Sequence, residues 1–190
     1  MNVARKRSAA AAVIGLGEST FSRKSDKTAR AHAVDACLGA VSDAGLKVAE
    51  IDGLLLNRSP IEPSSVLPLH LKRDIGLGDL SLLASIEAEG SSAIQMIQYA
   101  ALAIGAGMVE KVLCVFADAP VGATGAGDAY SISMNLIGLD GWDERHGLIG
   151  ATGGFALSVQ RYFHLYGADS NALFEAAAAD REWAALNPKA

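Results

Sequence analysis

Residues 81–118 read SLLASIEAEGSSAIQMIQYAALAIGAGMVEKVLCVFAD, the most regular pattern in the chain. The apolar runs at residues 81–88 and 111–117 have the length and composition of buried strands. Between them, small and apolar residues recur at spacings of three and four, which predicts a helix. The residues expected on its buried face are Ala93, Ile97, Ala100 and Ile104. The stretch therefore predicts a strand, a sharp turn, a helix and another strand.

The turn of this stretch is Glu89-Gly90-Ser91-Ser92, where a strand meets a helix N-terminus. Such a place presents unpaired backbone N–H groups and the positive end of the helix dipole. We therefore expect a ligand site there. Ser91 and Ser92 are candidate nucleophiles or helix caps. A serine nucleophile needs a positioned base, which the neighbouring sequence lacks, so capping is the favoured role.

The residues that precede this stretch continue the alternation of strands and helices. Apolar runs predict strands at residues 9–15 and 51–57, and a short helix is expected over 67–75. A longer helix is predicted over 27–44, capped by Ser25 or Asp26 and ended by Gly45. Its expected inner face is Val34, Cys37, Leu38 and Val41. This alternation predicts an α/β fold with a doubly wound, mostly parallel sheet.

The composition is that of a globular protein. The chain has 190 residues, 51% of them hydrophobic, and a formal net charge of −5. The acidic balance argues against nucleic acid or an anionic membrane as the main partner, and no apolar run has the length of a membrane span. Cys37 and Cys114 lie in apolar patterns, which favours reduced core thiols in the cytoplasm.

The pattern changes after residue 118. Residues 120–154 are rich in glycine and show no clear period, as in functional loops. Two helices are predicted after them, at residues 154–166 and from a cap at Ser170 to Asn187-Pro188. We therefore predict an α/β core over residues 1–118 and a loop and helical lobe over 119–190. His146 is the loop's imidazole and a candidate substrate-binding residue, although a surface histidine is the commoner case.

Several motifs, in order, resemble the N-terminal half of the thiolase superfamily, especially its sterol-carrier and lipid-transfer-protein type. They are GLGEST (15–20), TARAHAVDACLGAVSDAGL (28–46) with IDGLL (51–55), GSSAIQMIQYAALAIGAGMVEKVLCVFAD (90–118) and the tail LYGADSNALFEAAAADREWAALNPKA (165–190). The resemblance implies a thiolase-like N-terminal domain: a mixed, mostly parallel sheet in the order 3-2-1-4, helices on both faces, and part of a loop lobe. It also implies a homodimer formed through the third strand, residues 81–88.

The resemblance also locates a missing group. Thiolases carry an acyl-accepting cysteine at this turn, and the corresponding position here is Gly90. Cysteine-free members of the group are associated with retro-aldol cleavage of acyl-CoA side chains, including those of steroids. That chemistry needs a base and an enolate-stabilising group but no acyl-enzyme. The resemblance therefore implies an acyl-CoA lyase, active as part of a complex, whose acid and base residues are unknown.

The implied site and partners complete this hypothesis. Gly90, Ser91, Ser92 and His146 are the expected substrate-binding residues, with a coenzyme A thioester as substrate and no permanently bound cofactor or metal. A second thiolase half or a DUF35/OB-type subunit is the expected partner, because the family's second half supplies a histidine and another cysteine. Two alternatives remain open: a non-catalytic thiolase-like subunit that binds acyl-CoA or a partner, and a conventional thiolase acyltransferase.

Overall fold

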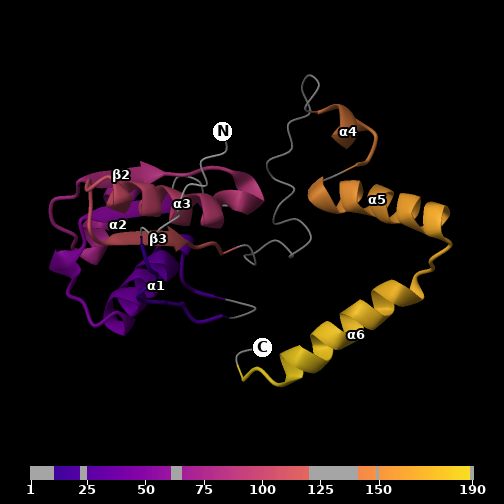
Figure 1. Cartoon of the computed structure of the whole chain (residues 1–190), viewed down its shortest axis with the longest axis horizontal. Helices are drawn as coiled ribbons and strands as arrows, with labels where there is room; N and C mark the ends of the chain where they lie inside the picture. The colour runs from indigo at the N-terminus through magenta and orange to yellow at the C-terminus, as the bar shows by residue number, and fades with distance from the viewer. Residues whose placement is uncertain (1–10, 22–24, 61–65, 120–140, 149, 189–190) are drawn as a thin grey trace, which may run out of the picture. The chain divides into compact units, whose positions relative to one another are not determined.

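The computed structural model describes residues 11–21, 25–60, 66–119, 141–148 and 150–188 (Figure 1). The chain forms two compact units, residues 1–130 and 131–190. The predicted boundary after residue 118 stays a prediction, because residues 120–140 lie outside the described ranges.

The first unit is built on a three-stranded parallel sheet. Its strands are β1 (Gly53–Asn57), β2 (Leu82–Ser85) and β3 (Val112–Phe116), in the order β2-β1-β3. Gly53 pairs with Leu82 on one side and with Val112 on the other. The α/β class and the parallel sheet are therefore confirmed, and the strand predicted third lies at an edge.

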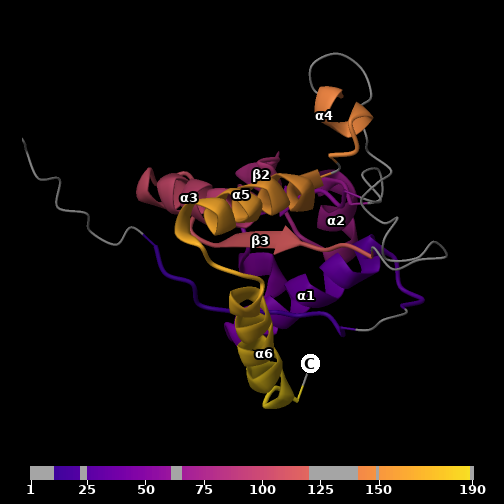
Figure 2. The same ribbon diagram turned by 90° about the vertical axis from the view of Figure 1, so that its right-hand side faces the viewer.

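Helices cover both faces of the sheet. Successive strand residues point to opposite sides, and both sets are buried. Leu54 and Leu56 pack with helices α1 (Ala29–Asp43) and α2 (Pro68–Ile75), and Leu55 packs with α3 (Ser92–Gly105). In both ribbon views, α1 and α3 lie on opposite sides of β3 (Figure 1, Figure 2). Two separate apolar cores hold the three layers together.

The ends of the helices follow local capping chemistry. The α1 helix begins after Thr28, whose Oγ1 accepts the N–H of Ala31 at 3.3 Å, so the predicted caps Ser25 and Asp26 are wrong. Gly45, with a φ of 66°, ends this helix as predicted. Gly76, with a φ of 81°, ends α2. A short 3₁₀ turn, Val48–Glu50, leads into β1.

The predicted strand at residues 9–15 is wrong in its described part. Residues 11–15 belong to no strand, and the side chain of Val13 is 77% exposed. Because β1 pairs directly with β3, no strand separates them, and the order 3-2-1-4 is wrong as well. The apolar run alone did not distinguish a strand from an extended segment on the surface of a helix.

This N-terminal segment, residues 11–21, lies along α1 instead. The N–H of Leu16 donates to Asp43 Oδ2 at 2.8 Å. A Cβ on Gly17 would come within 1.9 Å of the carbonyl oxygen of Ala36, so the two backbones approach as closely as glycine allows. The glycine pair at 15 and 17 therefore serves close packing against a helix.

The buried face of α3 matches the predicted one at Ala100 and differs from it elsewhere. Its buried residues are Ser92, Met96, Ala100 and Ala103. Ile97, predicted to be buried, is 47% exposed. The difference arises because the sheet touches one narrow stripe of this helix, and the buried Ser92 fixes which stripe that is. Alanine-rich sequence offers several apolar faces and does not select among them.

The second unit contains helices α4 (Trp142–Arg145), α5 (Gly150–Tyr166) and α6 (Asn171–Ala185). Both long helices were predicted, and Ser170 takes the cap position of α6 without a side-chain hydrogen bond. Aromatic side chains of α5 are largely exposed, since Phe155 and Tyr166 are each 71% exposed. In the part of the chain that the structure describes, no helix is long and apolar enough to cross a membrane.

Candidate functional site

The turn after β2 forms a closed set of hydrogen bonds. A 3₁₀ turn, Glu89–Ser91, leads directly into α3. Ser91 Oγ donates to the carbonyl oxygen of Ala88 at 2.8 Å. Ser92 Oγ donates to the carbonyl oxygen of Glu89 at 2.8 Å and accepts the N–H of Ala88 at 2.9 Å. Both hydroxyls are thus used by the turn, and neither has a histidine or carboxylate partner among the described residues.

Gly90 opens space at the tip of this turn. It is exposed, and a Cβ added to it would meet no atom within 4 Å. Glu89 beside it has a φ of 48°, the one positive value among the described residues other than glycine. A residue of this kind in the left-handed region costs about 1–3 kcal/mol and is common at functional turns. Nothing in the sequence pattern indicated this strain.

A polar clamp, formed by Asn57, Arg58 and Glu87, lies beside the turn and was not predicted from the sequence. The carboxylate of Glu87 accepts the Asn57 side-chain N–H at 3.0 Å. It also accepts the backbone N–H and the Nε–H of Arg58, both at 3.1 Å. Asn57 donates in addition to the carbonyl oxygen of Ile86 at 3.2 Å. The sequence did contain a signal for this clamp, namely the polar pair Asn57-Arg58 at the end of an apolar run. Parallel strands end together at the edge where ligands bind, so polar residues at a strand end are candidates for a site.

Ser59 ties the same edge of the sheet to the segment that follows β3. Its hydroxyl is buried and donates to Asp118 Oδ1 at 2.5 Å. Asp118, which follows β3, also accepts the N–H of Ala119 at 3.0 Å. Residues 57–59, at the end of β1, therefore connect this strand to the segments that follow both neighbouring strands.

His146 belongs to the second unit and lies just after α4. Its side chain is exposed, and Nδ1 donates to the carbonyl oxygen of Trp142 at 2.8 Å. The two rings are also 4.8 Å apart. The structure holds this imidazole against its own helix, and a substrate-binding role for it stays a prediction.

The two cysteines are poor nucleophiles. Cys37 lies on the buried face of α1, and burial raises the pKa of its thiol to about 12. Cys114 is exposed on β3, so its predicted place in the core is wrong. Its apolar surroundings still raise its pKa to about 11. Both thiols are protonated at neutral pH, and the thiolate is the reactive form.

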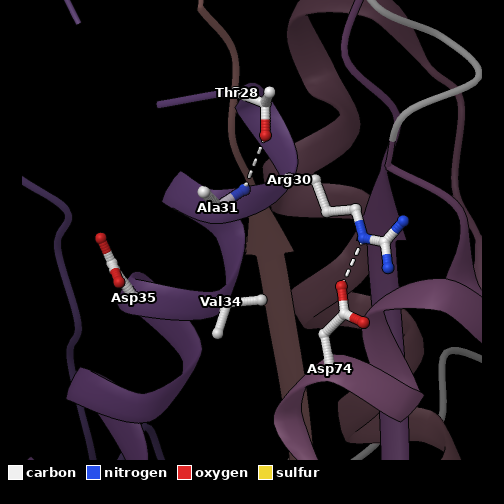
Figure 3. A pocket seen from close by; sticks show the side chains of 6 residues that line it. All are labelled: Thr28, Arg30, Ala31, Val34, Asp35 and Asp74. Atoms are coloured by element: carbon white, nitrogen blue, oxygen red, sulfur yellow. Dashed lines mark hydrogen bonds and ion pairs between the residues drawn. The ribbon is translucent and has the colours of Figure 1, made fainter. Parts of the chain in front are cut away.

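A surface pocket of about 460 Å³ lies apart from the turn, between α1 and α2 (Figure 3). Its polar feature is an ion pair in which Arg30 Nε donates to Asp74 Oδ2. This hydrogen bond raises the pKa of Arg30 and lowers that of Asp74. None of the predicted site residues lines this pocket. Among the described residues, no group of three or more histidines, cysteines or carboxylates could hold a metal ion.

Comparisons with known proteins point to one kind of enzyme. No family model matches the chain. It is 31% identical over 95% of its length to a steroid side-chain-cleaving aldolase of Thermomonospora curvata. It is 30% identical over 95% to a 17-hydroxy-3-oxo-4-pregnene-20-carboxyl-CoA lyase of Mycobacterium tuberculosis. Among solved structures, an Ltp2-ChsH2(DUF35) aldolase matches 94% of the chain with a TM-score of 0.75 and 31% identity.

These relatives correct the assignment to a lipid-transfer-type thiolase, which is wrong. The proteins that match nearly the whole chain are named an aldolase and a lyase. By contrast, an acetyl-CoA acetyltransferase from Syntrophomonas wolfei reaches a TM-score of only 0.48 at 18% identity, which supports no assignment. The names of these relatives contain the aldolase, steroid and CoA chemistry that the sequence resemblance implied. The chain spans 46% and 47% of the length of the two curated relatives.

Proposed function

We propose that this chain is part of an acyl-CoA lyase that cleaves a steroid side chain by a retro-aldol reaction. The observation that carries the proposal is the match, at 30–31% identity over 95% of the chain, to a steroid side-chain-cleaving aldolase and a steroid carboxyl-CoA lyase. The match is almost continuous, so it includes the turn at Gly90 and the strand ends around it.

The reaction fits a site without a nucleophile. A base removes the proton of a hydroxyl at Cβ of the thioester, and the bond between Cα and Cβ breaks. The hydroxyl oxygen becomes the carbonyl of a released ketone, and the electron pair passes to Cα as the enolate of a shorter acyl-CoA, which is then protonated. No acyl-enzyme forms. Gly90, the two turn serines and the protonated thiols of this chain are compatible with such chemistry.

This chain would contribute the place where the thioester lies. The turn stands at the carboxyl ends of β1 and β2, where parallel sheets bind their ligands. Gly90 leaves room there, and Ser91 and Ser92 shape the backbone around it. Substrate contacts from Gly90, Ser91, Ser92 and His146 are part of the proposal. The base and the enolate-stabilising group are assigned to the remaining part of the assembly.

The proposed assembly contains at least one further polypeptide region. The chain covers 44% of the matched aldolase chain, whose name gives two components, Ltp2 and ChsH2(DUF35). We accordingly propose a partner that completes the site, a coenzyme A thioester as substrate and no permanently bound cofactor. Pairing of two copies through the open edge of β2 remains part of the same proposal.

Co-expression with candidate partners tests the proposed activity. The purified complex is incubated with a steroid β-hydroxyacyl-CoA, and the ketone and the shortened acyl-CoA are measured by mass spectrometry. We expect both products in equal amounts. A Gly90→Leu variant, which fills the open tip of the turn, should lose most of the activity, while Gly78→Leu at another open glycine should not. Thioester binding without either product would instead indicate a non-catalytic subunit.

A further inference from the structure

The strained residue Glu89 stands between two anchored neighbours. On the helix side, the buried hydroxyl of Ser92 bonds both Ala88 and Glu89. On the strand side, Glu87 is bound to Asn57, the last residue of β1, and to Arg58, which follows it. A left-handed residue with a side chain persists only where its surroundings fix it. Ser91 adds a local bond within the turn, from its hydroxyl to the carbonyl oxygen of Ala88, so Glu87 is the support that comes from the neighbouring strand.

We propose that Glu87 is a positioning residue for the turn. Together with Asn57 and Arg58, it keeps Glu89 in the left-handed conformation and so fixes where Gly90 lies relative to the end of β1. Glu87 acts through the backbone of the turn and does not contact the substrate. The inference rests on the proposed function in one respect, since the ligand that the turn receives is the acyl-CoA thioester.

The geometry of the clamp favours positioning over simple charge pairing. The side chains of Arg58 and Glu87 are 45% and 42% exposed, and an ion pair at such a surface contributes little to stability. The carboxylate, however, receives three donors, and two of them are a backbone N–H and a side-chain amide whose own places are set by β1. Three donors at the end of β1 therefore fix the orientation of the Glu87 carboxylate. Because this side chain is held, the backbone of residues 86–88 is held as well.

A kinetic comparison tests the role in catalysis. Glu87→Ala, Glu87→Gln and the control Asp35→Ala are measured in the complete complex, at a temperature where circular dichroism shows each to be folded. Asp35 pairs with Lys27 at a similar exposure, 41% and 52%, on another face. We expect Glu87→Ala to lower kcat/KM about tenfold or more, because misplaced binding groups cost orders of magnitude. Glu87→Gln keeps one acceptor oxygen and should recover part of the loss, while Asp35→Ala should change nothing.

Two results would overturn the positioning role: unchanged kinetics in Glu87→Ala, or an equal loss in Asp35→Ala. A second experiment needs no activity and remains informative if the proposed function fails. Glu89→Gly relieves the left-handed strain, so it should raise the unfolding midpoint of the otherwise unchanged chain by a few degrees. In the Glu87→Ala background the turn is already free to relax, and the same substitution should give no gain. Equal gains in both backgrounds would refute the clamp.

Discussion

At the scale of single residues, the two thiols differ in solvent exposure, but both have a raised pKa. Cys37 is buried and Cys114 is exposed. We expect iodoacetamide at pH 7.5 to label Cys114 slowly and Cys37 not at all. Because the thiolate reacts, the rate at Cys114 should rise about tenfold per pH unit up to about pH 10. Intact-mass analysis with Cys114→Ser as control measures this. Rapid labelling at neutral pH would contradict the raised pKa.

The sequence identified residues whose role depends on their neighbours along the chain. It did not identify residues whose partners are distant in sequence. Gly45 was predicted as a helix end, because the left-handed residue after a helix is commonly a glycine. His32 is buried, and its ring bonds Ser19 through Nδ1 and Ser25 through Nε2, a pairing that the sequence pattern did not indicate. The clamp at Glu87 was likewise missed. Such partners meet only after the chain has folded, so no spacing along the sequence reveals them.

At the scale of elements, predictions were correct where local sequence pattern decides the structure, and wrong where tertiary contacts decide it. The strands β1, β2 and β3 were predicted because each is a short apolar run bounded by turn residues. The segment 11–21 has a similar composition, but its two glycines pack on α1 and leave its apolar side chains exposed. The buried stripe of α3 was predicted correctly only at Ala100. Periodicity finds an element, and tertiary contacts choose which face is buried.

Replacing Gly17 should therefore detach the N-terminal segment. A Cβ there would meet the backbone of α1 at Ala36 and Ala40, and backbone cannot move aside cheaply. We expect Gly17→Ala to cost about 1–3 kcal/mol of unfolding free energy, as overpacking does elsewhere. The amides of residues 11–21 should lose protection in hydrogen exchange. Gly78→Ala, at a glycine with open space, is the matched control and should be neutral. Unchanged protection in Gly17→Ala would mean that the segment does not pack on α1.

At the scale of the whole chain, large apolar side chains remain exposed in both units. In the second unit, Trp183 and Leu186 are each 75% exposed, and no residue of α6 is buried. In the first, Leu102 on α3 is 71% exposed. Large apolar side chains that gather on an exposed element mark a candidate interface. This agrees with the proposal that a partner completes the assembly.

The exposed surface yields a prediction that is independent of catalysis. The chain purified alone should bind the dye ANS and self-associate in sedimentation velocity, and a partner that completes the assembly should abolish both. Trp183→Ser should weaken dye binding and association because it removes the largest exposed side chain of α6. Glu175→Ser, a polar change on the same helix, should leave both unchanged. A monodisperse monomer without dye binding would show that these side chains need no partner, and the two-component assembly proposed for the lyase would then lose its physical basis.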